Sequence, residues 1–164
     1  MRTRYILEDT NFIYKPNLAG EFRKEDRFPS TARTCNIIIP DLELVSEMIE
    51  DGFNVRQTKP SEGYEEGFEP EYFVKATLKF QSEGSRSNPV INLIDPDGYS
   101  IPLDEDTVGN LDSIRIKRNS VRAVLSPYTR GGGEHPTLYI QTLYAEQDTE
   151  NDPWAGKFPR RPRD

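Results

Sequence analysis

The chain has 164 residues, of which 34% are hydrophobic and 30% are charged, and its formal net charge at pH 7 is −7. This length suits one domain with its own core and leaves hardly any room for a second. The high content of Pro, Gly, Tyr and Phe favours a loop-rich β protein over a helical bundle. No apolar run approaches the roughly 20 residues that a membrane helix needs, and no signal peptide opens the chain, so we expect a cytoplasmic protein.

The first part of the chain is typical of strands. Residues 4–7 and 11–14 are rich in aromatic and β-branched side chains and predict one strand or two short ones. Residues 32–39 form the strongest strand pattern and contain Cys35, the single cysteine. An internal disulfide is therefore excluded, and we expect Cys35 to be a buried structural thiol, which a reducing cytoplasm tolerates.

One helix is predicted after this strand. Pro40 ends the strand and Asp41 is a favourable helix N-cap. Hydrophobic residues then recur at helical spacing, at Leu42, Val45, Met48 and Ile49. The pair at 51–52 ends the helix, and residues 53–57 predict a strand that leaves it.

The middle of the chain predicts three strands. Residues 72–80 alternate cleanly, with one face made of Tyr72, Val74, Ala76, Leu78 and Phe80 and the other of Phe73, Lys75, Thr77 and Lys79. Residues 89–94 and 99–103 read as two strands joined by the turn at 95–98. Residues 104–112 are expected to hold a helical turn.

A basic stretch runs from residue 113 to 133. It holds five cations and no Asp or Glu, the cations being Arg115, Lys117, Arg118, Arg122 and Arg130. Ile114 and Ile116 alternate with the first two cations, so a strand here would bury one face and charge the other. The alternation breaks at residues 118–120, which indicates a bulge or bend, and residues 136–144 predict the last strand.

The predicted architecture is mainly β: a small barrel or a curled antiparallel sheet of six to eight strands, with one short helix and long loops. We expect a domain over residues 1–145 and a flexible charged tail over residues 146–164. The tail is acidic before Trp154 and basic at its end. It is either simply disordered or a docking segment for protein partners.

The basic and aromatic residues predict a surface that binds a polyanion. We expect the outer row of the strand at 72–80 and the row at 113–117 to form it, with further residues where the second strand enters a Gly-rich loop. Cations for phosphates and exposed rings for bases are what a single-stranded nucleic acid requires. The alternative is an ordinary solvated face of a sheet. The candidate binding residues are Phe73, Lys75, Lys79, Arg115, Lys117, Arg122, Tyr128 and Arg130.

Motifs for catalysis or cofactor binding are weak. The loop at 130–136 lacks the spacing of a phosphate-binding loop, and His135 has no Cys or His nearby to complete a metal site. The acidic groups at 95–98 and 104–106 are better explained as a turn and a helix cap than as metal ligands. We expect no catalytic residue, no metal and no cofactor. A nuclease with a carboxylate-bound metal is the third-ranked alternative.

The order and spacing of several segments resemble the single-stranded DNA-binding proteins of tailed bacteriophages, which are similar to OB-fold proteins. The resemblance covers residues 11–158, and the segments that carry it are 17–20, 34–39, 50–56, 72–80, 89–94, 126–128 and 138–144. It implies an OB-fold-like domain that protects single-stranded DNA during phage replication or recombination in the host cytoplasm, without catalysis. It also implies that the aromatic and basic residues named above hold the strand.

The C-terminus departs from this resemblance. Many proteins of this type end in an acidic tail that recruits replication partners, whereas this chain ends with Arg160, Arg161 and Arg163 close to its terminus. Recruitment of replication or recombination proteins through the tail is therefore an open expectation, as is the oligomeric state. The alternative function is a structural or interaction module of a phage particle, which the Pro-rich loops and the lack of catalytic residues would also suit.

Overall fold

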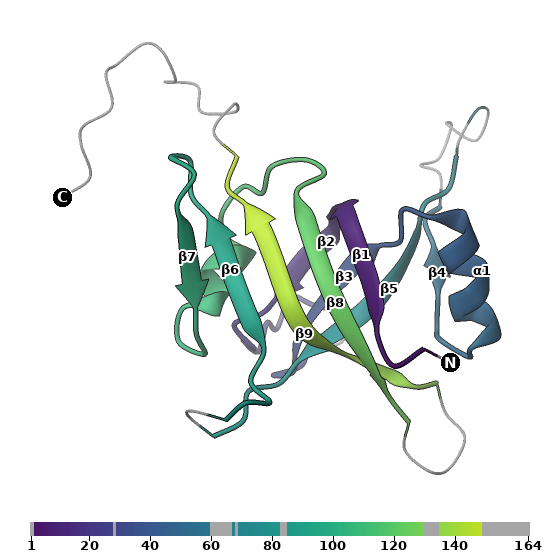
Figure 1. Ribbon diagram of the computed structural model, residues 1–164, viewed down its shortest axis with the longest axis horizontal. Coiled ribbons are helices and arrows are strands. Elements are labelled where there is room, and N and C mark those ends of the chain that lie inside the picture. Colours follow the sequence, from purple (N-terminus) through teal and green to yellow (C-terminus); the bar gives the residue numbers. More distant parts are fainter. Residues whose placement is uncertain are drawn as a thin grey trace.

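The fold is a single nine-stranded sheet with one α-helix, as shown by a computed structural model that describes residues 2–27, 29–59, 67, 69–82, 85–129 and 135–148 (Figure 1). The strands are β1 Tyr5–Thr10, β2 Phe12–Asn17, β3 Arg33–Ile38, β4 Arg56–Gln57, β5 Tyr72–Leu78, β6 Val90–Ile94, β7 Ser100–Leu103, β8 Val121–Tyr128 and β9 Thr137–Glu146. The helices are α1 Leu42–Glu50 and the 3-10 helix η1 Val108–Asp112. The prediction of a mainly β chain with one short helix is confirmed.

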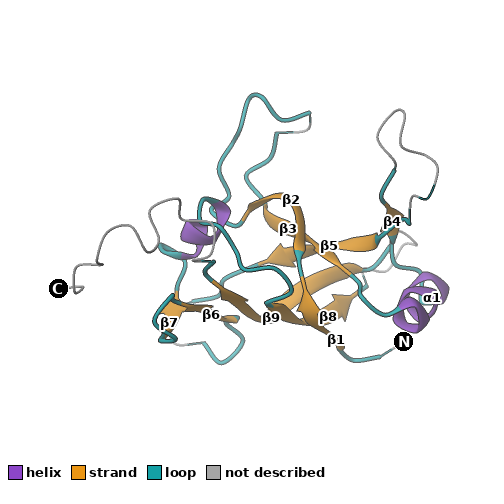
Figure 2. Ribbon diagram, turned by 90° about the horizontal axis from the view of Figure 1, so that it is seen from above, coloured by secondary structure: helices purple, strands orange, loops and turns teal. Residues whose placement is uncertain are grey.

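The sheet order is β1-β8-β9-β5-β3-β2, with β6 added to β9, β7 to β6 and β4 to β5. Strands β1 and β2 lie at opposite ends of this order, although only Asn11 separates them in the chain. The sheet curls so that β2 and β3 lie on one side of the interior and β1, β8 and β9 on the other (Figure 2). The expectation of a purely antiparallel sheet is wrong, because β9 pairs in parallel with both β5 and β6.

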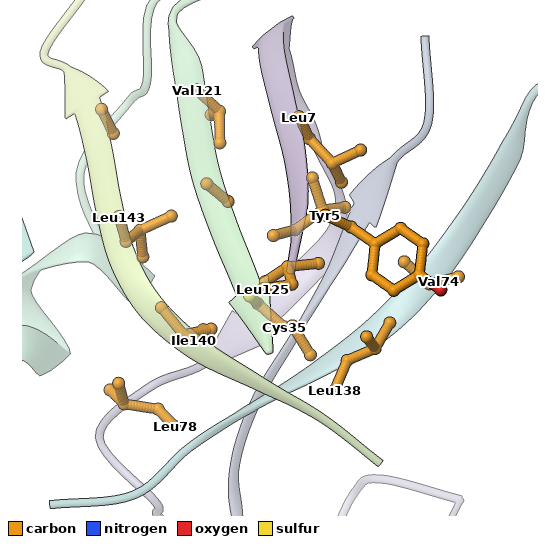
Figure 3. Packing of buried hydrophobic residues seen from close by; sticks show 14 of the residues in the cluster. Tyr5, Leu7, Cys35, Val74, Leu78, Val121, Leu125, Leu138, Ile140 and Leu143 are labelled. Carbon is orange, nitrogen blue, oxygen red and sulfur yellow. The ribbon is translucent and has the colours of Figure 1, made fainter. Parts of the chain in front are cut away.

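The core fills the interior of the curled sheet (Figure 3). Strand alternation explains its composition, since every second residue of a strand points to the same face. Side chains such as Leu7, Leu125 and Leu143 reach it from β1, β8 and β9, while Val74 and Cys35 reach it from β5 and β3. Cys35 is a buried free thiol, as predicted, and its burial raises its pKa.

Helix α1 begins and ends where the sequence predicts. The Asp41 carboxylate accepts a hydrogen bond from the Glu43 backbone N–H at 3.0 Å, and Gly52 follows the helix with φ of +91°. Of the four hydrophobic residues that recur at helical spacing, Leu42 and Ile49 are more than half exposed. The buried residues are Leu44, Val45 and Met48. They lie on the side of the helix that meets the core, and Leu42 and Ile49 flank that side.

The basic segment at 113–120 is not a strand. A single bridge from Ile116 to Gln147 is its only β pairing among the described residues, and regular pairing begins at Val121. Buried and exposed side chains still alternate here as predicted, because Ile114 and Ile116 are partly buried and pack on the core. The predicted bend is confirmed by a turn in which Asn119 has φ of +60°.

A buried carboxylate joins η1 to the residues that follow β2. Asp112 accepts hydrogen bonds from the backbone N–H groups of Leu18 at 2.8 Å and Ala19 at 2.9 Å, and its side chain is 6% exposed. The guanidinium of Arg23 lies 3.7 Å from the same carboxylate. Because the two N–H groups hold the backbone of Ala19 in place, η1 and the start of the β2–β3 connection form one unit.

We predict that Gly109→Ala destabilises this unit. A Cβ at Gly109 would lie 2.7 Å from the Cβ of Ala19, which Asp112 prevents from moving away. Overpacking of this kind costs about 1–3 kcal/mol, more than the gain in helix propensity. Urea unfolding of Gly109→Ala, Ala19→Gly and the double variant measures the effect. The double variant should recover part of the lost stability, and additive losses would contradict the steric explanation.

We also predict that the chain loses stability at alkaline pH because Tyr5 loses its proton. Burial and a 2.6 Å hydrogen bond donated to Asp51 raise the pKa of Tyr5 to about 12 from its ordinary value of 10.0. The folded chain therefore keeps a proton that the unfolded chain releases, so this stabilisation is complete below pH 10 and is lost as the pH rises toward 12. Thermal melts from pH 8 to 12 should show a shallower decline for Tyr5→Phe than for the unchanged chain. Equal declines would contradict the assignment.

Candidate nucleic-acid interface

An open groove with a volume of about 660 Å³ lies on the outer surface of the sheet. Its lining comes from β8, β9, the end of β5 and the connection that leads into β6. The lining residues are Lys79, Gln81, Arg86, Ser87, Asn88, Val90, Ser126, Tyr128, Tyr139, Ile140 and Gln141. Within the part of the chain that the structure describes, the lining contains two cations, two tyrosines and no carboxylate.

The position of the groove follows from the way β9 pairs. Along one edge β9 first meets β5, at the pair Thr77 and Tyr139, and then β6, beginning at the pair Val90 and Thr142. The other edge of β9 pairs with β8 throughout, with a register irregularity next to Val124. The groove lies at the point where β5 departs and β6 begins. Figure 1 shows the last part of β9 between β8 and β6.

Two tyrosines give the groove its aromatic surface. The rings of Tyr128 and Tyr139 meet edge to face, with centroids 6.1 Å apart and planes inclined by 67°. Tyr128 is 54% exposed, so its ring is accessible from solvent. An exposed ring that a neighbouring ring holds in place loses little side-chain freedom when a base stacks on it.

Two cations complete the groove. Lys79 and Arg86 are both exposed, and no ion pair of either is found among the residues that the structure describes. Gln81, Asn88 and Ser126 also line the groove, and the Asn88 side chain accepts from the Gln81 backbone N–H and donates to the Ser82 carbonyl. A flexible anion with flat apolar rings would match this lining.

Some of the predicted binding residues on or next to β5 and β8 lie in the groove, and others lie outside it. Lys79 and Tyr128 lie in the groove. Lys75 is exposed on the same outer face of β5, four residues before Lys79. Phe73 faces the predicted side but is only 5% exposed, because the ring of Tyr14 covers it with centroids 5.5 Å apart. The expectation of an exposed stacking ring at Phe73 is therefore wrong.

Arg115 and Lys117 lie at the opposite end of β9. The Lys117 backbone N–H donates to the Glu146 carbonyl, and the Asp148 backbone N–H donates to the Arg115 carbonyl, each at 2.8 Å. Eight residues separate Tyr139 from Gln147, which corresponds to about 26 Å along a strand. The two predicted rows therefore do not form one face, because the row at 113–117 adjoins the end of β9 and not β5.

Arg122 and Arg130 complete the predicted set. Arg122 is exposed on β8 and forms a 2.9 Å ion pair with Glu8 of β1. Since that pair is open to solvent on both sides, it holds Arg122 only weakly. Arg130 lies outside the described residues, as does the tail beyond residue 148.

Sequence reasoning missed Tyr139, Arg86 and Tyr14. Tyr139 faces outward by the alternation of the last predicted strand, so a search for outward aromatic residues would have found it. Arg86 lies in the polar connection before β6, where no periodicity marks it. Tyr14 is exposed because its φ of +62° departs from ordinary strand geometry, which a pattern of residue types does not reveal.

The carboxylates considered as metal ligands have structural roles. Asp95 accepts from the backbone N–H groups of residues 97 and 99, each at 2.9 Å, within the predicted turn. Asp104 caps the segment before η1, where hydrogen bonds from Thr107 and the backbone N–H of Asp106 lower its pKa. Nδ1 of His135 lies 2.7 Å from the Gly52 carbonyl. Among the described residues, no group of three or more His, Cys, Asp or Glu is arranged to hold a metal ion.

Neither described helix has the length and apolar character needed to cross a membrane.

Comparison with solved structures places the fold beside phage proteins. The single-stranded DNA-binding protein of bacteriophage Enc34, C-terminally truncated, matches with a TM-score of 0.51 at 12% identity, over 90% of this chain and 87% of that one. The same Enc34 protein in complex with ssDNA matches with a TM-score of 0.50 at 12% identity, over 90% and 88%. The bacteriophage T7 protein gp2.5, also a single-stranded DNA-binding protein, matches at 14% identity over 98% and 99%, but its TM-score of 0.38 carries no argument about fold.

The family comparison covers nearly the whole chain. Among curated proteins no significant match is found. The model of the family described as "Putative phage ssDNA-binding domain" matches residues 2–156 and therefore includes every residue that lines the groove. The chain belongs to this phage ssDNA-binding domain family.

Proposed function

We propose that the chain is a non-catalytic, sequence-tolerant single-stranded DNA-binding protein and that the groove beside Tyr139 is its binding site. The observation that carries the proposal is the lining, which combines Lys79 and Arg86 with Tyr128 and Tyr139 and, among the described residues, contains no carboxylate. Family membership supports it, as does the shared fold of the Enc34 protein, which has been solved in complex with ssDNA.

The chemistry of the groove explains a preference for single strands. A stacked base contributes about 1–3 kcal/mol, and it must be unstacked from its own neighbours before a tyrosine can contact its face. Bases in a duplex are not available in this way. Phosphate contacts with Lys79 and Arg86 add affinity that weakens with salt. Neither kind of contact reads the identity of a base, so binding is sequence-tolerant.

We further propose that the curled sheet is of the OB type and that the protein acts on DNA in the host cytoplasm during phage replication or recombination. The position of β1 and β2 at opposite ends of the sheet order, one residue apart in the chain, supports an OB-type arrangement. Lys75 extends the site along β5. Because residues 146–148 still pair with the folded domain, we place the start of the tail for replication or recombination proteins after residue 148, three residues later than the sequence predicts. No cofactor is required.

Binding of labelled oligo-dT tests the site. Tyr128→Ala should weaken binding about 5- to 150-fold, which corresponds to the loss of one stacked base. Lys79→Ala should weaken it and reduce the slope of log affinity against log salt by about 0.7, because one phosphate contact is lost. Fluorescence anisotropy across a salt series, with duplex DNA for comparison, measures both effects.

Lys117→Ala is the matched control. Lys117 is an exposed lysine like Lys79 but lies near the far end of β9. It should leave affinity and salt slope nearly unchanged. An equal effect of the two lysine substitutions would contradict the groove as the site, and equal affinity of the unchanged chain for single and double strands would contradict the function.

A further inference from the structure

Tyr14 has an unusual backbone conformation for an aromatic residue in a strand. Its φ is +62°, in the left-handed region that side chains other than Gly, Asn and Asp rarely adopt. The register between β2 and β3 is irregular between Ile13 and Asn17, which indicates a bulge at this place. The result is a tyrosine that is 64% exposed on the outer face of the sheet. Strained conformations of this kind concentrate at functional sites.

Phe73 supports the Tyr14 ring from beneath. The two rings meet edge to face, with their planes inclined by 79°. Phe73 is buried, yet it is not among the residues of the hydrophobic core, because it lies on the outer face of β5 beneath Tyr14. This arrangement repeats the one in the groove, where Tyr139 lies edge to face with the exposed Tyr128.

Two cations flank this aromatic pair. Arg56 of β4 is directly opposite Phe73 in the register, so both side chains project from the same face of the sheet. Lys75 lies two residues beyond Phe73 on that face. Both cations are exposed, and neither has an ion pair among the residues described. Two rings and two cations therefore occur together here, as they do in the groove.

Between the groove and the Tyr14 ring, the outward-facing residues that strand pairing places side by side include no carboxylate. Thr34, Thr77 and Tyr139 lie side by side across β3, β5 and β9. Asn36 and Lys75 form the next pair toward Tyr14. Thr77 is four residues from Phe73, about 13 Å along the strand. Successive nucleotides of a stacked strand are about 3.4 Å apart, so one strand can contact both places through different nucleotides.

We propose that Tyr14, supported by Phe73 and flanked by Arg56 and Lys75, is a second base-stacking site for single-stranded DNA. The strand reaches it across Thr77 and Lys75 after leaving the groove. This inference rests on the proposed function and adds to it a path for the strand across β5 toward β2. A site of this kind binds only oligonucleotides long enough to span both places.

Tyr14→Asn is the informative substitution, since asparagine accepts the left-handed conformation without a ring. Tyr14→Phe retains the ring. Tyr99→Asn is the matched control, because Tyr99 is 70% exposed beside the turn that precedes β7 and lies outside the lining of the groove. The affinity of the full chain is measured for oligo-dT of about 3 nucleotides, which spans only about 7 Å and cannot reach both places, and of about 16 nucleotides, with thermal melts of each variant.

We expect Tyr14→Asn to weaken binding of the longer oligonucleotide about 5- to 150-fold, with little change for the shorter one and no loss of thermal stability. Tyr14→Phe and Tyr99→Asn should resemble the unchanged chain. Unchanged affinity of Tyr14→Asn for the longer oligonucleotide overturns the inference, as does an equal loss for both lengths. If the unchanged chain binds no single-stranded DNA, the proposed function fails too. If Tyr128→Ala weakens binding and Tyr14→Asn does not, only the second site is lost.

Discussion

The structure depends on β9, because the ten residues of this strand pair with three neighbouring strands. One edge pairs with β8, and the other is shared between β5 and β6. A strand edge can pair with only one partner at each position, so β5 must leave before β6 can begin. The irregularity between β8 and β9 lies close to that change of partner: Leu125 pairs with Ile140 and Val124 with Thr142, which leaves Gln141 as an extra residue. The groove is the consequence of this division.

The arrangement of the strands and helices also determines where the charged residues lie. A chain with a net charge of −7 binds a polyanion only if its carboxylates are kept apart from the binding surface. A second pocket, of about 520 Å³ between β1 and α1, is lined by Glu8, Asp41, Glu43 and Glu47 among others, and it shares no lining residue with the groove. An acidic face of this kind repels a nucleic acid strand, which is consistent with the proposed binding site in the groove.

Local patterns in the sequence predicted most of the elements but not which of them become neighbours. Alternation over residues 72–80 identified the two faces of β5, and Asp41 and Gly52 identified the ends of α1, because these signals arise from residues close together in the chain. The burial of Phe73 and the distance of Lys117 from the groove depend on contacts with residues far away in sequence. Tyr14 covers Phe73 from β2, and Glu146 binds the backbone of Lys117 from the end of β9. Lys79 and Tyr128 were predicted correctly as neighbours of one surface, since both strands adjoin β9.

The pairing of β1 with β8 has a consequence for synthesis of the chain. Tyr5 pairs with Leu125, so the first strand cannot take its place until the ribosome has added the 120 residues that follow Tyr5, up to Leu125. At typical rates of about 5–20 residues per second, this interval is on the order of 10 s. During that time, the apolar side chains of β1 and an unpaired strand edge are open to association with other chains. The abundance of this protein in the cell that makes it would then depend on how well the nascent chain is shielded, as well as on the stability of the finished fold.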